Sequence, residues 1–199
     1  PHLVELCVAG ANLDCALDAN GSRALSEGLA SASSLQRLDL SHAALGTGAA
    51  ELVATLPQLP RLSALDLSHC PFGEPSAAAA LAAALPGCVA LRELRLRGCA
   101  IGDSAAMMLA TSLDELSLDV LDLNRNPIRR EGAAALASAT ASKRMRAFCE
   151  VPLATLEEGQ PPRELDLAGR AIGVAGALAL SLVLEKRGAG LVTLSLARN

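Results

Sequence analysis

Asp39 and Asp66 each precede a histidine by three residues, namely His42 and His69. Two imidazoles and two carboxylates can ligate zinc. Duplication of one sequence phrase would also place these residues side by side without any metal, and the repeats described below favour that reading. No nucleophile is paired with a base by spacing, no glycine-rich phosphate loop follows a strand, and no H-E-x-x-H motif occurs. The sequence therefore predicts no catalysis, no metal site and no cofactor.

An eleven-residue phrase, best seen at residues 91–101, recurs along the chain. Leucine or a substitute occupies its first, fourth, sixth and eleventh places. The fourth and sixth places are leucine in thirteen of fourteen cases, the exception being Val8. The copies begin 32, 27, 29, 27, 44 and 29 residues apart, which is the signature of a repeat array. They start at Leu3, Leu35, Leu62, Leu91, Leu118, Pro162 and Leu191.

Each phrase is expected to form a short strand and a turn, and a helix is expected to follow most phrases. In the third repeat the segment after the phrase is dominated by alanine. Leu81 and Leu85 lie four residues apart on one face, and alanine is the best helix former, so a packed helix is expected. Pro57 and Pro60 end the helix of the second repeat. The predicted helices cover residues 22–32, 49–56, 76–85, 104–113, 131–139 and 175–184.

This pattern resembles the leucine-rich repeat, and more narrowly its ribonuclease-inhibitor-like class, which includes Ran GTPase-activating proteins and the repeat arrays of NOD-like receptors. Three features carry the narrower resemblance. They are a repeat length of about 28, a ninth place holding Cys70, Cys99 or Asn126, and a following Gly-x-x-Gly-Ala-x-x-Leu stretch, best seen at 129–136 and 173–180. The resemblance implies an α/β solenoid of about seven repeats, with a curved parallel sheet on the concave side and helices on the convex side.

Side chains alternate along a strand, so places four and six point into the core and places three, five and seven face solvent. In the geometry that the resemblance implies, the solvent side is the concave face. Adjacent strands lie about 4.8 Å apart, so the place-five residues form one column. The column is either a polar docking strip for a basic or mixed-charge partner, or simply a solvated sheet face. The candidate partner-binding residues are Asp39, Asp66, Arg95, Arg97, Asp122 and Asp166.

The spacing of 44 residues leaves an insertion at about residues 141–161. It is either an exposed loop or a degenerate half-repeat, with Phe148, Val151 and Leu153 packed against the array, or a protrusion that contacts a partner. Its basic residues Lys143, Arg144 and Arg146 are the candidate contacts for the second case.

Composition excludes two classes of partner. The chain of 199 residues is 51% hydrophobic and can bury a continuous core, but it has no run of about 18 uninterrupted apolar residues, so membrane insertion is not expected. The net charge of −4 lacks the basic surface that a phosphate backbone requires, and Phe72 and Phe148 are the only aromatic residues available for stacking on bases. Nucleic acid is therefore not an expected partner.

Six cysteines form no C-x-x-C pair, and two of them occupy the ninth place of the repeat. They are expected to be reduced thiols in an intracellular, reducing compartment, with the cytoplasm favoured over an organelle. The chain is expected to be a single array over residues 1–199. Neither end carries the polar cap of a complete solenoid, so the chain is expected to be a fragment of a longer array or a subunit whose end is covered.

The function that these observations favour is a non-enzymatic scaffold or recognition module. It would bind one or several protein subunits of a large eukaryotic complex, and no small-molecule substrate is expected. The alternative is a regulator of a small GTPase that resembles the Ran GTPase-activating proteins.

Overall fold

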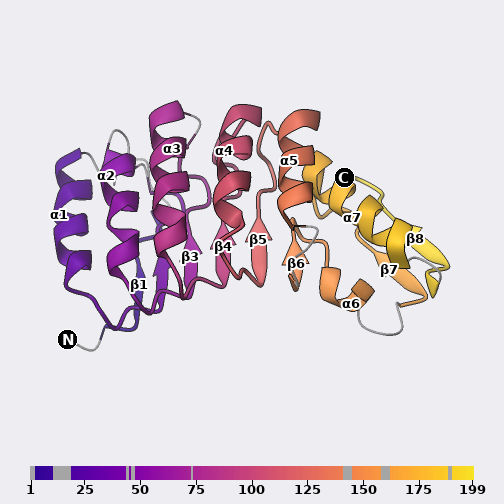
Figure 1. Cartoon of the computed structure of the whole chain (residues 1–199), viewed down its shortest axis with the longest axis horizontal. Helices are drawn as coiled ribbons and strands as arrows, with labels where there is room; N and C mark the ends of the chain where they lie inside the picture. Colours follow the sequence, from indigo (N-terminus) through magenta and orange to yellow (C-terminus); the bar gives the residue numbers. More distant parts are fainter. Residues whose placement is uncertain are drawn as a thin grey trace.

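The computed structural model describes residues 3–10, 19–43, 45, 48–72, 74–140, 145–157, 162–187 and 190–199. Strands and helices alternate along the chain, and Figure 1 shows the helices side by side in one layer and the strands in another. The expected α/β repeat solenoid is therefore confirmed.

The strands are short and pair in parallel with the next one in sequence, except that β6 does not pair with β7. The register joins equivalent places of neighbouring repeats, so that Leu38, Leu65, Leu94 and Leu121 stand in one row. Six strands form one sheet and the last two form a second sheet. The strands are β1 (Glu5–Cys7), β2 (Arg37–Asp39), β3 (Ala64–Asp66), β4 (Glu93–Arg95), β5 (Val120–Asp122), β6 (Ala147–Phe148), β7 (Glu164–Asp166) and β8 (Thr193–Ser195).

The six predicted helices form where the sequence places them, with ends that agree to within one turn, and a further short helix, which was not predicted, lies in the segment expected as an insertion. The α-helices are α1 (Ala19–Ala30), α2 (Ala49–Ala54), α3 (Pro75–Ala84), α4 (Asp103–Leu113), α5 (Arg130–Thr140), α6 (Leu153–Glu157) and α7 (Gly173–Arg187). Two 3₁₀ helices, η3 (Leu56–Gln58) and η4 (Leu85–Gly87), follow α2 and α3, and each has a proline in its first turn. A proline there ends the α-helix because it cannot donate a backbone hydrogen bond.

The core lies between the two layers. The leucines at places four and six of repeats two to six are at most 9% exposed. Small residues bring the helices close together: a Cβ atom on Gly132 of α5 would lie 2.7 Å from Asp103 Oδ1 and 2.9 Å from Asp103 Cα in α4. The same Asp103 oxygen accepts hydrogen bonds from the backbone N–H groups of Arg129 and Gly132, both at 2.9 Å, and so caps the neighbouring helix.

In repeats three to five, the ninth place links the repeat to the one before it. Cys70 Sγ donates to the carbonyl of Leu40 at 3.0 Å, and Cys99 Sγ donates to that of Leu67 at 3.1 Å. Asn126 continues this ladder through Nδ2, which donates to the carbonyl of Leu96 at 2.6 Å. The cysteine thiols and the Asn126 amide thus make the same hydrogen bond to the preceding repeat. Burial raises the pKa of both thiols to about 12, so they remain protonated donors.

The segment expected as an insertion contains a strand and a helix, β6 and α6. β6 pairs in parallel with β5, with Leu121 opposite Phe148. Phe148, Val151 and Leu153 are all buried. The described residues therefore contain an eighth strand that the seven repeats counted from the sequence do not include.

Candidate partner-binding surface

The place-five residues line up as the repeats predict, but in two groups. The register aligns Cys7, Asp39, Asp66, Arg95 and Asp122 across β1 to β5. Asp166 instead lies in the second sheet, opposite Ser195. The single column expected from the sequence is therefore interrupted after β6, where the equivalent residue, Cys149, is buried.

All four aspartates at place five hold the turn that follows their strand. In each case Oδ1 accepts a hydrogen bond from the backbone N–H two residues later, an arrangement known as an Asx turn. The bonds are Ser41 to Asp39 at 2.9 Å, Ser68 to Asp66 at 2.8 Å, Asn124 to Asp122 at 2.9 Å and Ala168 to Asp166 at 2.9 Å. The carboxylates therefore have a structural role through Oδ1, while Oδ2 makes other contacts: that of Asp39 accepts from Cys7 Sγ at 3.7 Å and that of Asp122 lies 3.7 Å from Arg97 Nη1.

Two of these carboxyl groups have pKa values below the usual 3.8. Burial pushes the pKa of Asp39 up, but hydrogen bonds from Ser41 and Cys7 and the charge of Arg95 outweigh it. The backbone hydrogen bond from Ala168 is the largest cause for Asp166, followed by a hydrogen bond with Ser195. Both groups are therefore ionised at neutral pH and can attract a cation.

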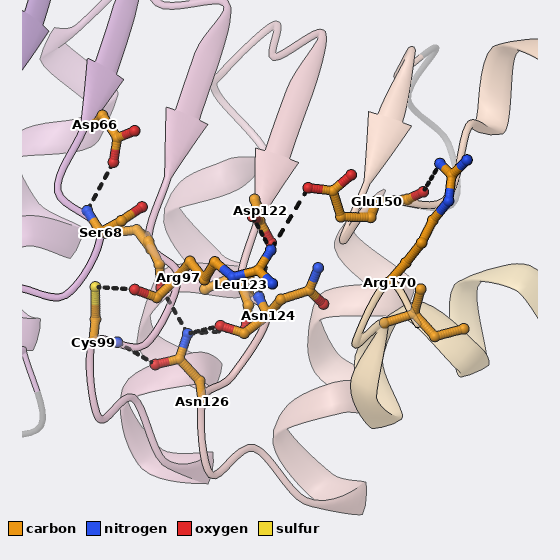
Figure 2. Close-up of polar contacts among 12 residues, drawn as sticks. Asp66, Ser68, Arg97, Cys99, Asp122, Leu123, Asn124, Asn126, Glu150 and Arg170 are labelled. Atoms are coloured by element: carbon orange, nitrogen blue, oxygen red, sulfur yellow. Dashed lines mark hydrogen bonds and ion pairs between the residues drawn. The ribbon is translucent and has the colours of Figure 1, made fainter. Parts of the chain in front are cut away.

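The two arginines expected in the site are already engaged by neighbours. Arg95 Nη2 lies 3.0 Å from Glu93 Oε2. Arg97 Nη1 lies 3.7 Å from both Asp122 Oδ2 and Glu150 Oε1, as Figure 2 shows. The Arg97 side chain is only 26% exposed and Asp122 only 11%, so this pair offers little surface to a partner.

A solvent-open hollow of about 290 Å³ lies on the sheet face over β1 to β4. We call this surface the acidic hollow. Four carboxylates and two guanidinium groups line it, and since Glu93 pairs with Arg95, negative charge is in excess. Its charged lining residues are Glu5, Arg37, Asp39, Asp66, Glu93 and Arg95. Glu5 and Arg37 could have been found from the sequence, because they occupy place three beside the aspartate column.

The rings of His42 and His69 stack with centroids 4.2 Å apart and planes inclined by 14°. Both residues, like Gly98, Arg125 and others at place eight, have φ near +60°, which the turn requires. Among the described residues, no group of three or more histidine, cysteine or carboxylate side chains could hold a metal ion. The histidine pair is therefore a product of the repeated turn.

His69 should show a depressed pKa. Burial lowers it below 6.5, and the charges of His42, Arg125 and Arg97 lower it further, against the opposing effect of Asp66. Because an unfolded chain takes up this proton near pH 6.5, the contribution of His69 to stability is complete above that pH and declines as the pH falls through the folded-state pKa. An NMR titration of the imidazole resonances measures this pKa. The His42→Asn variant should bring it closer to 6.5, and an unchanged value would contradict the coupling.

A polar cluster that the sequence does not reveal lies where the six-stranded sheet ends. The backbone carbonyl of Glu150 accepts a hydrogen bond from Arg170 Nη1 at 3.5 Å, while its side chain faces Arg97 (Figure 2). Glu150 thus links the fourth repeat to the second sheet. Beside it, Asn124 is 2% exposed, and neither polar atom of its side chain has a hydrogen-bond partner.

Of the basic residues expected in the insertion, Arg146 follows the buried Met145 and is exposed. Lys143 and Arg144 lie outside the described residues.

The comparisons with known proteins agree with the fold. The family model described as Leucine Rich repeat matches residues 88–110 and 116–137, which span parts of two repeats. This match supports a leucine-rich repeat protein, as do the stacked parallel strands. No curated protein matches the chain. Within the described ranges, no helix has both the length and the apolar character needed to cross a membrane.

Proposed function

We propose that this leucine-rich repeat chain is a non-enzymatic binding module that receives a basic or mixed-charge protein partner in the acidic hollow. Leucine-rich repeat domains generally mediate protein–protein interaction. The observation that carries the proposal is the hollow itself, where four carboxylates surround a space of about 290 Å³ on the face not covered by helices.

The charges of the hollow support this choice of partner. Glu93 neutralises Arg95, whereas Arg37 has no ion pair among the described residues. Glu5, Asp39 and Asp66 therefore face a single unpaired guanidinium group. A lysine or arginine of a partner would meet the Oδ2 atoms of the two aspartates, of which that of Asp39 also accepts a hydrogen bond from Cys7 Sγ at 3.7 Å. A carboxylate of the same partner would pair with Arg37.

The charge of the hollow can be removed without disturbing the turns. In the double variant Asp39→Asn, Asp66→Asn, the amide oxygens still accept from Ser41 and Ser68, so the fold is retained. Substitution by lysine would remove these acceptors, so a loss of binding could not be distinguished from a loss of folding. Partners captured from cells by the full-length protein are identified by mass spectrometry, and their affinities are measured at several salt concentrations. We expect the double variant to bind about threefold to tenfold more weakly and with a smaller salt dependence.

A matched control removes the same charge from the helical layer. Glu27→Gln, Glu131→Gln changes two exposed carboxylates on α1 and α5, and it should leave both affinity and salt dependence unchanged. Equal binding by all three proteins would mean that the hollow is only a solvated surface.

The same purified protein tests the alternative function. Stimulated GTP hydrolysis by candidate small GTPases would replace the binding proposal with a regulatory one.

The proposal has three further parts. They are participation in a larger eukaryotic complex, contact through Arg146 and its basic neighbours, and residence in a reducing compartment. The five described cysteines, all free, are consistent with the last of these.

A further inference from the structure

The sheet is broken between β6 and β7. β6 pairs with β5, while β7 pairs only with β8, so the edges of two separate sheets meet at this point. Figure 1 shows β6 and β7 apart, with α6 near the end of β6. The two edges differ in their free hydrogen-bonding groups.

The edge of β6 is closed by its own chain. Cys149 donates its backbone N–H to Leu121 of β5, so the N–H and C=O groups of Phe148 point to the opposite edge. There Phe148 N–H donates to the Val151 carbonyl at 3.0 Å, and Val151 N–H donates back to Phe148 at 2.9 Å. Cys149 and Glu150 form the intervening two-residue turn, with φ of 48° and 63°. A further strand cannot pair with β6 while this turn is in place.

The edge of β7 is open. Arg163 accepts from Val192 and Thr193, and Leu167 donates to Ser195, so these residues use their backbone groups toward β8. By alternation, the N–H and C=O groups of Glu164 and Asp166 point away from β8 and into the break. Among the described residues, no strand pairs with this edge. The side chains of Glu164 and Asp166 are exposed, while Leu165 between them is buried.

We propose that an extended segment of a partner protein adds as a strand to the free edge of β7, with a basic–apolar–basic sequence opposite Glu164, Leu165 and Asp166. Strand addition satisfies the unpaired backbone groups. Side chains opposite each other in register share a face, as Leu165 and Leu194 do. The middle residue therefore faces the core and the two flanking residues face the carboxylates. The inference rests on protein binding as the function but concerns a surface separate from the acidic hollow.

The charges of the side chains on the edge of β7 determine that the partner segment should be basic. β1 also has a free edge, but its two outward side chains are Glu5 and Cys7, whereas β7 presents two carboxylates. The pKa of Asp166 is held below 3.8, first by the Ala168 backbone hydrogen bond, so this group is charged at neutral pH. A basic segment is therefore attracted more strongly to β7 than to β1.

The test uses labelled ten-residue peptides and the whole chain. A peptide with a central Lys-Leu-Lys should bind, and its Kd should be at least about tenfold lower than that of the Glu-Leu-Glu peptide. Hydrogen–deuterium exchange should slow at the amides of Glu164 and Asp166 in the complex. Protection elsewhere, or no binding at millimolar peptide, would overturn the proposal.

Two variants of Glu164 test separately the contribution of its backbone N–H and that of its side-chain charge. Glu164→Pro removes an N–H that points into the break, at the first position of an edge strand where proline is tolerated, and should weaken binding about tenfold. Glu164→Lys keeps the N–H and should reduce the preference for Lys-Leu-Lys over Glu-Leu-Glu at least fivefold. Retained binding by Glu164→Pro, or an unchanged preference in Glu164→Lys, would overturn the assignment to β7.

Glu5→Pro is the matched control, because Glu5 is also a place-three glutamate that begins a strand on a free edge. Val4 and Val8 bond to β2, so the N–H of Glu5 also points outward. Because Glu5 also lines the acidic hollow, the readout compared is the peptide-induced protection of the Glu164 and Asp166 amides, which this variant should leave unchanged. The double variant Asp39→Asn, Asp66→Asn should also leave that protection unchanged, so failure at the break and failure at the acidic hollow can be told apart.

Discussion

Replacing Asn126 with alanine is expected to destabilise the chain by about 3 to 5 kcal/mol. Nδ2 donates to the carbonyls of Leu96 and Leu123 at 2.6 and 2.8 Å, and Oδ1 accepts from the N–H groups of Cys99 and Ile101 at 2.8 and 3.0 Å. Alanine satisfies none of these four backbone groups. Because they belong to two repeats, the loss acts on the junction between repeats. The shift in urea midpoint, followed by circular dichroism, measures the effect.

Asn124 provides the control two residues earlier in the same turn. Its amide is more deeply buried than that of Asn126 but has no partner, so Asn124→Leu removes an uncompensated polar group. We expect that variant to unfold at the same or a higher urea concentration than the parent. A similar loss in both variants would show that polar character at the turn, and not the hydrogen bonds of Asn126, sets stability.

Gly132→Ala should destabilise by about 1 to 3 kcal/mol, although alanine is the better helix former by about 1 kcal/mol. The added methyl group would lie 2.7 Å from Asp103 Oδ1 and 2.9 Å from Ala106 Cβ and Asp103 Cα. Since one of these atoms is backbone, α4 and α5 must separate. Separation also lengthens the hydrogen bonds by which Asp103 caps α5. Thermal unfolding measures the change.

Gly28→Ala in α1 is the matched substitution, because a Cβ there meets no atom within 4 Å. It should stabilise by about 0.5 to 1 kcal/mol through helix propensity alone. Stabilisation by both substitutions would contradict the tight α4–α5 contact.

Periodicity was sufficient to predict the fold. Leucines at places four and six can all be buried only if equivalent places stack, and the register of Leu38, Leu65, Leu94 and Leu121 shows that they do. Helix positions followed because alanine-rich segments separate most of the leucine phrases.

The missed repeat has a definite cause. Its phrase begins at Met145, places Phe148 where leucine is usual, and has Glu150 at the sixth place. The 44-residue spacing is thus one interval of 27 followed by a shortened one of 17. Phe148 fills the same core row, but a leucine-based pattern does not detect it.

The site was predicted only in part. Position alone identified the aspartate column, but the bond from each carboxylate to its own turn depends on backbone geometry that spacing does not reveal. The ion pair between Arg97 and Glu150 could not be predicted either, because it depends on the tight turn after β6. The residues that line the acidic hollow come from four strands, so they could be identified only once the register of those strands was known.

The break in the sheet also bears on how the chain unfolds. Stability in a repeat array passes between neighbours through their shared interfaces. Among the described residues, β7 and β8 share no strand pairing with the other six strands, so the packing of α7 against α5 and α6 is their main connection. We therefore expect the C-terminal strands to melt, or to be pulled away under force, before the N-terminal repeats do.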